Sequence, residues 1–220
     1  MPNSCNRVIQ QKLTIKGPFR WKGGELSLFD AVEVKGVGVY IWTIPWEGRY
    51  LTNYVGMTND SFYNRLKSHE SSYYNGLYRI YNPDKLADGI HDYFWEGLAL
   101  SYRQAKLKDL EKKFKSNRAV YEDMIEQLLT LYRIFLIPID VPDEVGANLE
   151  NIKEKWKAES RFIDRIEDGI VIDLHLNSKL VKAFYDNWDF YSHSYRDDKM
   201  IDVEFKGSKQ IIGLSKSITC

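Results

Sequence analysis

Residues 38–69 decide the fold expected for this chain, and they read GVYIWTIPWEGRYLTNYVGMTNDSFYNRLKSH. Two parts of this region, Val37–Thr43 and Tyr50–Thr58, are rich in β-branched and aromatic residues, which favour strands. The tetrapeptide Pro-Trp-Glu-Gly at 45–48 lies between them and is typical of a turn. We therefore predict an antiparallel β-hairpin.

A helix is expected directly after this hairpin. Asn59, Asp60 and Ser61 are good N-cap residues, and the apolar spacing that follows predicts a helix to about Tyr73. Arg65 and His69 are four positions apart on this helix, so their side chains are neighbours on one face.

The hairpin and the helix bring four polar side chains within reach of one another. If Tyr40 pairs with Tyr54, the turn is centred on residue 47 and the two phenols are cross-strand neighbours on one face. Each of Tyr40, Tyr54, Arg65 and His69 would, on its own, be interpreted as structural. Together they supply two phenols, a guanidinium and an imidazole for one phosphate-sized patch.

The order of these motifs resembles that of the GIY-YIG nuclease family: Gly38-Val39-Tyr40, then Tyr54-Val55-Gly56, then Arg65 and His69 on a helix. The close resemblance covers about 32 residues. It implies an α+β fold with a small antiparallel sheet of three core strands flanked by helices. It also implies metal-dependent hydrolysis of phosphodiester bonds in DNA, with 5′-phosphate products and Mg²⁺ or Mn²⁺ as cofactor.

The resemblance further assigns roles. Tyr40 is implied to act as general base on the attacking water, and Arg65 to oppose negative charge in the transition state. Tyr54 and His69 are implied to position the water and relay protons. Because a free phenol has a pKa of about 10, this role requires the pKa of Tyr40 to be lowered.

A metal-binding glutamate is expected on a helix after the third strand. Four glutamates occur in the local pattern E-x-x-[LI]: Glu25, Glu122, Glu126 and Glu167. Glu167 alone follows the predicted strand at 132–139, so it is the preferred catalytic and metal-binding residue, with Glu126 as the main alternative. A salt bridge between Glu167 and Arg65 is the structural alternative. A strand beginning at residue 170 would remove Glu167 from a helical stripe.

Basic residues in the middle of the chain offer a candidate nucleic-acid contact. Seven basic residues against two acids lie between 103 and 118, which fits a phosphate-binding helix or an ordinary solvated one. The residues predicted to bind nucleic acid are Arg79, Arg103, Lys106, Lys112 and Lys113. Asn177 is a weaker candidate for the catalytic site.

The chain is expected to form one embellished domain over residues 1–220, with N- and C-terminal extensions. Its predicted parts are the hairpin and first helix at 37–73, a helical insertion at 98–130, and the third core strand with the metal-ligand helix at 132–176.

Composition sets limits on the partners. The 31 basic and 31 acidic residues give zero net charge, which argues mildly against a nucleic-acid partner. Two distant cysteines without a CxxC pair argue against structural zinc. No signal-like or membrane-length apolar segment occurs, so a soluble cytoplasmic protein without a membrane partner is expected. The oligomeric state and the choice between DNA and RNA stay open, as do a repair or branched-structure nuclease and a catalytically silent nucleic-acid-binding module.

Overall fold

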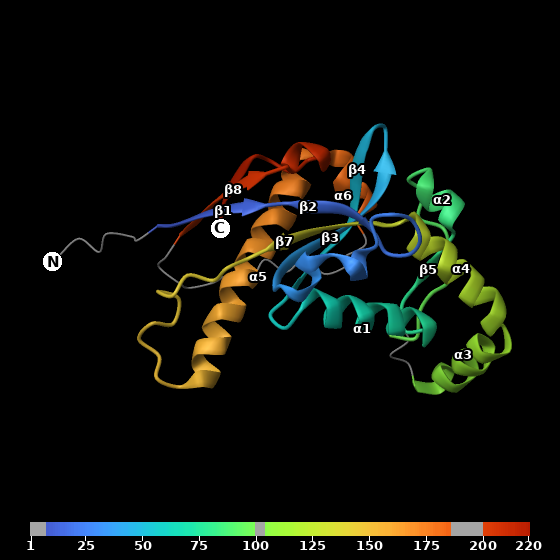
Figure 1. Cartoon of the computed structure of the whole chain (residues 1–220). Helices are drawn as coiled ribbons and strands as arrows, with labels where there is room; N and C mark the ends of the chain where they lie inside the picture. The colour runs from blue at the N-terminus through green and yellow to red at the C-terminus, as the bar shows by residue number, and fades with distance from the viewer. Residues whose placement is uncertain (1–7, 100–103, 186–199) are drawn as a thin grey trace.

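The computed structural model describes residues 8–99, 104–185 and 200–220. Mixed helices and strands give an α+β fold (Figure 1). The strands are β1 Ile9–Thr14, β2 Lys16–Arg20, β3 Gly38–Trp46, β4 Arg49–Thr58, β5 Ile80–Tyr81, β6 Tyr93–Trp95, β7 Arg133–Pro138, β8 Ile201–Lys206 and β9 Ser217–Thr219. The α-helices are α1 Phe62–Tyr74, α2 Pro83–Ala87, α3 Gln104–Ser116, α4 Arg118–Leu131, α5 Ile152–Asn177 and α6 Lys179–Phe184, with short 3₁₀ helices at Leu28–Asp30, Val32–Lys35 and Ser208–Gln210.

The central sheet is antiparallel, with the strand order β2-β7-β3-β4. It contains the three expected strands β3, β4 and β7, and β2 adds a fourth at the edge beside β7. The sequence prediction placed β2 in an N-terminal extension, because Gly17-Pro18 looks like a turn. The strand instead accommodates these residues at a register irregularity between Lys16 and Phe19.

The predicted β3–β4 hairpin is confirmed, but its predicted register is wrong. Tyr40 lies opposite Gly56, and Tyr54 lies opposite Trp42. Two features cause this two-residue difference. The turn is centred between Glu47 and Gly48, because Trp46 pairs with Arg49. A β-bulge adds a second residue, because Trp42 pairs with Tyr54 whereas Thr43 pairs with Thr52, so Asn53 has no partner in β3. Tyr40 and Tyr54 are therefore diagonal neighbours on one face of the sheet.

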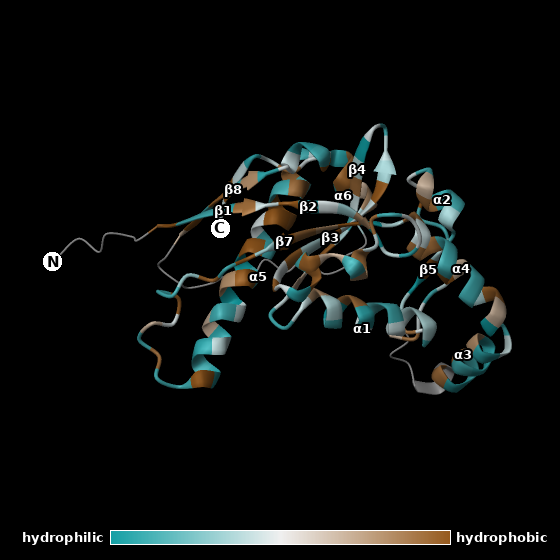
Figure 2. Ribbon diagram, viewed as in Figure 1, coloured by the Kyte–Doolittle hydropathy of each residue, from teal (hydrophilic) through white to brown (hydrophobic). Residues whose placement is uncertain are grey.

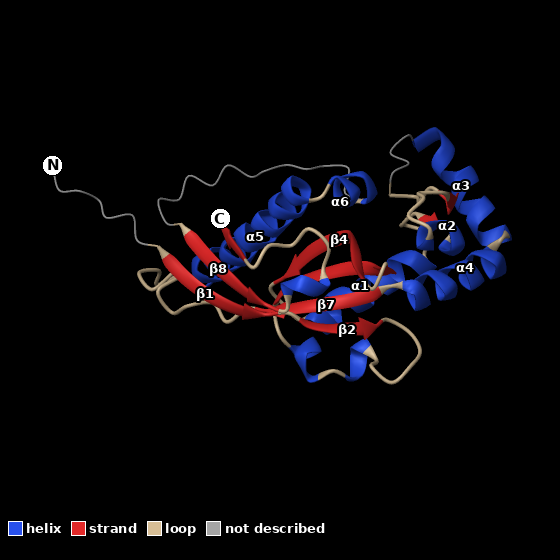
Figure 3. Ribbon diagram, turned by 90° about the horizontal axis from the view of Figure 1, so that it is seen from above, coloured by secondary structure: helices blue, strands red, loops and turns tan. Residues whose placement is uncertain are grey.

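A second sheet of order β1-β8-β9 lies beside the central one, with β1 and β8 parallel. Seen from above, β1 and β8 run side by side at the end of the molecule that also carries α5 (Figure 3). The apolar alternation at 201–205 predicts a strand, and these residues form β8. The same alternation at 32–35 also predicts a strand, but these residues form a 3₁₀ helix.

Helix α1 has nearly the bounds that the sequence predicts, and the predicted helical insertion forms two helices. Ser61 caps α1 by accepting a hydrogen bond from the backbone of Asn64 at 3.1 Å. The long helical stretch after residue 98 breaks at Asn117, which separates α3 from α4. Both helices lie at the end of the molecule away from α5, in both views (Figures 1 and 3).

Helix α5 is continuous through the segment for which a strand was the alternative. It runs from Ile152 to Asn177, so no strand begins at residue 170. The helix packs along β3, β4 and β9, and its buried stripe includes Ile163, Ile166 and Ile170. Glu167 is consequently held on a rigid element that crosses the central sheet.

The core is formed around β3 and β7, where nearly every side chain is buried. Figure 2 shows β7 as hydrophobic along most of its length, whereas α3 is largely hydrophilic. None of the described helices has the length and apolar character needed to cross a membrane.

Candidate active site

Gly56 lets the two motif tyrosines approach each other on the face of the β3–β4 hairpin that they share. A Cβ atom at Gly56 would lie 2.6 Å from Cζ of Tyr40 and 2.8 Å from Cε1 of Tyr54, closer than van der Waals contact permits. With glycine there, the two ring centroids are 6.2 Å apart. The second motif glycine therefore has a steric role in bringing the phenols together.

The first motif glycine begins β3 for a conformational reason. Gly38 has a φ of 140°, which side chains with a Cβ rarely adopt, and an added Cβ would lie 3.0 Å from the backbone nitrogen of Ile139. This close approach lets β3 start against β7 and fixes the position of Tyr40 two residues later.

Helix α1 supplies the imidazole and the guanidinium. His69 is only 3% exposed, and its Nε2 lies 2.7 Å from the hydroxyl of Tyr40. Arg65 Nε donates a hydrogen bond to the same hydroxyl at 3.2 Å, while the Arg65 side chain as a whole remains exposed. The phenol of Tyr40 thus has two partners one helical turn apart, and the guanidinium can still reach a ligand from solvent.

Burial controls the charge states of Tyr40 and His69. It raises the pKa of Tyr40 well above its usual value, and nearby Tyr54 adds to this, while Arg65 opposes it. Burial also lowers the pKa of His69 to about 3, with Arg65 contributing. The chain without ligand therefore holds a neutral phenol against a neutral imidazole. The expectation that Tyr40 has a lowered pKa is wrong for this state, because desolvation outweighs Arg65.

Glu167 of α5 lies within electrostatic range of this cluster and influences both Tyr40 and Tyr54. Burial raises the pKa of Glu167 to about 8, and the charges of Asp164 and Asp168 add to the effect, whereas Arg65 opposes it. Within the described residues, the Glu167 carboxylate forms neither a hydrogen bond nor an ion pair, so the alternative of a salt bridge to Arg65 is not observed there.

The acidic groups are too few to form a metal site made entirely of protein ligands. In residues 8–99, 104–185 and 200–220, no group of three or more His, Cys, Asp or Glu side chains could hold a metal ion. A single carboxylate fits a hydrated hard cation such as Mg²⁺, which keeps several waters and takes other oxygens from a phosphate substrate. The raised pKa of Glu167 also fits a cation at this position, because a bound positive charge would stabilise its carboxylate.

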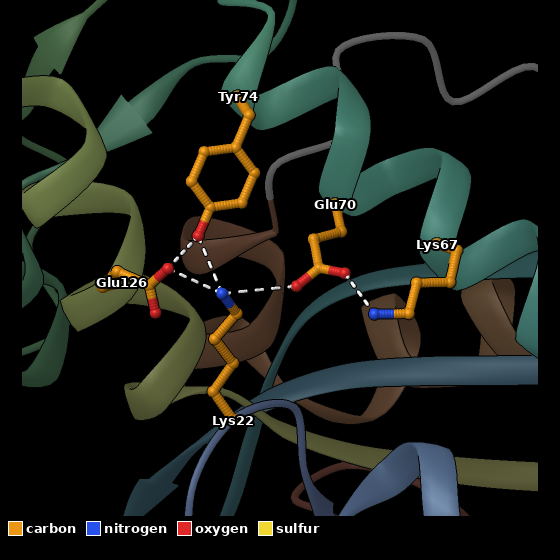
Figure 4. Close-up of polar contacts among 5 residues, drawn as sticks. All are labelled: Lys22, Lys67, Glu70, Tyr74 and Glu126. Atoms are coloured by element: carbon orange, nitrogen blue, oxygen red, sulfur yellow. Dashed lines mark hydrogen bonds and ion pairs between the residues drawn. The ribbon is translucent and has the colours of Figure 1, made fainter. Parts of the chain in front are cut away.

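Glu126, the main alternative metal ligand, is committed to a different cluster (Figure 4). The ammonium of Lys22 lies 2.6 Å from Glu126, 2.7 Å from the Tyr74 hydroxyl and 3.4 Å from Glu70, and Tyr74 also donates a hydrogen bond to Glu126. Although burial opposes ionisation, the hydrogen bond from Lys22 lowers the pKa of Glu126. The cluster joins the loop after β2 to α1 and α4, so it has the properties of a structural cross-link.

Glu122 and Asn177, two further candidates for the site, have their contacts outside the Tyr40 cluster. Glu122 forms an ion pair with Arg118 at 2.7 Å on α4. Asn177, at the end of α5, donates hydrogen bonds to Asp173 and to Ser215. The predicted addition of Asn177 to the catalytic site is therefore not supported by its contacts.

The residues predicted to bind nucleic acid are spread over two regions. Lys112 and Lys113 are exposed on α3, at the end of the molecule away from α5 (Figure 1). Lys106 belongs to α3 as well, whereas Arg103 lies outside the described residues. Arg79 is half-buried against two aromatic rings, 5.0 Å from the centroid of Tyr93 and 5.9 Å from that of Tyr81.

One polar contact of the cluster was not predicted from the sequence. The Tyr78 hydroxyl lies 2.9 Å from Nδ1 of His69, on the opposite side of the ring from Tyr40. The signal available was that a buried histidine needs partners for both ring nitrogens. The aromatic segment after α1, residues 75–97, contains three tyrosines, and spacing alone could not select Tyr78.

Comparison with known proteins gives no match, whether to a family model, to a curated protein or to a solved structure.

Proposed function

We propose that this chain is a metal-dependent endonuclease of the GIY-YIG type that hydrolyses phosphodiester bonds in DNA. The observation that carries the proposal is the set of contacts made by the buried phenol of Tyr40. Its hydroxyl is hydrogen-bonded to His69 and Arg65, and Glu167 is close enough to raise its pKa. Further support comes from the order of β3, β4, α1, β7 and α5, which follows the order of elements that the motif resemblance implies.

The residues of the cluster divide the work of hydrolysis. Arg65 is exposed and positively charged, so it can bind a non-bridging phosphate oxygen and oppose the charge that develops during attack. Tyr40 would take the proton of the attacking water once its own proton has moved to His69, which is 2.7 Å away. Tyr54, on the same face, would orient the water or the phosphate.

The proposed cation would be held by Glu167, with Mg²⁺ or Mn²⁺ as the fitting ions. When bound, such a cation supplies Lewis-acid stabilisation of the oxygens around phosphorus. Glu167 in turn would lose its protonated state, because a nearby cation favours the carboxylate.

DNA is the proposed substrate class, with RNA as a second class to be tested. Because the chain has no net charge, affinity must come from local basic residues such as Lys112 and Lys113 together with Arg65. Binding is consequently expected to weaken strongly as the salt concentration rises.

Nicking of supercoiled plasmid tests the proposal directly. The wild-type chain is expected to nick plasmid in Mg²⁺ or Mn²⁺ and to lose this activity in EDTA. Tyr40→Phe and Glu167→Gln should both abolish nicking, whereas Glu126→Gln, a matched glutamate outside the site, should retain it. Ligation of the products tests for 5′-phosphate and 3′-hydroxyl ends.

Several results would contradict the assignment. If Tyr40→Phe and Glu167→Gln cleave as fast as the wild type, these residues are not the catalytic centre. If the chain binds DNA but cleaves neither plasmid, branched duplex nor RNA with any divalent cation, it is a binding module and the enzymatic proposal fails.

A further inference from the structure

The His69 imidazole is held from both sides by phenols. Its Nε2 is 2.7 Å from the Tyr40 hydroxyl, and its Nδ1 is 2.9 Å from the Tyr78 hydroxyl. The Tyr78 ring is itself held in place, with its centroid 5.3 Å from that of Tyr73 in an edge-to-face contact and 5.6 Å from that of His69. Tyr78 lies in the short segment between α1 and β5, outside the hairpin and the helix that carry the motif residues.

The hydrogens in this cluster can be assigned from its donors and acceptors. Arg65 Nε carries a hydrogen and can only donate, so the Tyr40 oxygen accepts from it. The hydrogen of Tyr40 is then best placed toward His69 Nε2, the nearest acceptor at 2.7 Å. A neutral imidazole carries one N–H, which must therefore be on Nδ1 and point at the Tyr78 oxygen.

The opposite tautomer satisfies fewer groups. With the hydrogen on Nε2, the Tyr40 oxygen would accept from both Arg65 and His69, and the hydrogen of Tyr40 would lose its acceptor on the imidazole. In that state the hydrogen of Tyr40 has only a weaker contact with the Tyr54 hydroxyl to turn to, and because Tyr40 is fully buried, a poorly satisfied hydroxyl there is costly. Tyr78 is only partly buried and can direct its own hydrogen to water while its oxygen accepts from Nδ1.

We propose that Tyr78 is a positioning residue for the proposed nuclease reaction. Its hydroxyl oxygen accepts the Nδ1–H of His69 and so holds the imidazole with a bare Nε2 against the hydroxyl of Tyr40. This inference rests on the proposed function, because it gives Tyr78 a part in the activation of Tyr40.

The proton movements balance in this arrangement. The O–H bond of Tyr40 breaks and an Nε2–H bond forms on His69, which leaves a phenolate beside Arg65 and an imidazolium whose Nδ1–H remains bonded to Tyr78. The phenolate then takes a proton from the water that attacks phosphorus. The leaving oxygen is protonated from solvent, and His69 returns its extra proton to solvent.

Tyr78→Phe removes only the accepting oxygen and is the variant that tests the proposal. Tyr121→Phe is the matched control, because it makes the same substitution at a tyrosine that stacks on Phe114, on the far helix pair and outside the His69 cluster. In Tyr78→Phe, kcat for plasmid nicking should fall roughly tenfold, the effect of one net hydrogen bond, with KM unchanged. The pH profile of kcat should also move, whereas Tyr121→Phe should match the wild type in all three.

Nitrogen-15 NMR of the His69 ring gives a readout that does not depend on cleavage. In the full-length wild-type chain, with the His69 signals assigned by their loss in His69→Gln, we expect a protonated Nδ1 and a bare Nε2. Tyr78→Phe should shift the tautomer population toward Nε2–H.

The two proposals fail in different ways. The role of Tyr78 is overturned, while nicking persists, by either of two results. One is a wild-type chain with the hydrogen on Nε2, and the other is a Tyr78→Phe variant with unchanged tautomer, kcat and pH profile. Absence of nicking in the wild type, with the expected tautomer present, overturns the nuclease function but leaves the hydrogen-bond assignment standing.

Discussion

Replacing Glu167 with glutamine should stabilise the cation-free protein at alkaline pH while it removes the proposed activity. The pKa of Glu167 is raised from 4.5 to about 8, chiefly by burial and then by Asp164 and Asp168. The folded chain therefore holds this proton more tightly than the unfolded chain does. Below pH 4.5 both states are protonated and the group costs nothing, whereas stability is lost as the pH rises from 4.5 to 8.

The size of this loss follows from the two pKa values. At about 1.4 kcal/mol for each pH unit, the interval from 4.5 to about 8 gives an upper bound of roughly 5 kcal/mol. Glu167 is only partly buried, so solvent screening reduces this figure, and we expect about 2–4 kcal/mol. Glutamine has nearly the same shape and no charge, so Glu167→Gln should recover that amount above pH 8.

Urea unfolding at pH 5, 7 and 9 in EDTA measures the effect. The free energy of unfolding of Glu167→Gln should exceed that of the wild type by an amount that grows with pH, and Mg²⁺ should narrow the gap at pH 9 by stabilising the wild type alone. Glu154→Gln, an exposed glutamate on the first turn of α5, is the matched control and should show no such trend. A wild-type chain as stable as Glu167→Gln at pH 9 would refute the reasoning, because it would mean that the carboxylate is already compensated within the protein.

Three further substitutions test the site and its surroundings. Tyr40→Phe should lower the nicking rate at least ~100-fold while circular dichroism shows an unchanged fold, because only the hydroxyl proposed to transfer the proton is lost. Gly56→Ala should lower the free energy of unfolding by about 1–3 kcal/mol in urea and impair nicking, because its Cβ would collide with the rings of Tyr40 and Tyr54. Glu126→Gln should destabilise the chain by less than about 1 kcal/mol at pH 7, since the Lys22–Glu126 pair is partly exposed. This difference should vanish in acid unfolding curves as the pH falls through the lowered pKa of Glu126, and nicking should stay at the wild-type rate.

Local sequence patterns predicted the elements that carry the site. The β-branched and aromatic runs around Tyr40 and Tyr54, the turn between them and the Ser61 cap each act through neighbouring residues, and the structure has the hairpin and helix they predict. Long-range partners were beyond such patterns, which explains why β2 was assigned to an extension rather than to the sheet.

The hairpin register shows where local reasoning stopped. Pairing about a turn centred on residue 47 aligns Tyr40 with Tyr54. The observed turn lies between Glu47 and Gly48, which shifts the register by one residue, and the extra residue Asn53 shifts it by one more beyond the bulge. Asn53 is 1% exposed, and its Oδ1 accepts a hydrogen bond from the hydroxyl of Tyr132 at 3.0 Å. This partner is 79 residues away in sequence, so the bulge is supported by a contact that the hairpin alone does not reveal.

Glu126 and Glu167 share the same local pattern, and only their surroundings in space distinguish them. Glu126 has a lysine and a phenol within hydrogen-bonding distance, and its pKa is lowered. Glu167 is partly buried on a helix with Asp164 and Asp168 close by, and its pKa is raised. A protein interior does not hold a charged carboxylate beside two others without compensation. Arg65 reduces the imbalance but does not remove it, so the missing positive charge must come from protonation or from a bound cation. Hydrolysis of a phosphodiester beside Tyr40 would use the bound cation.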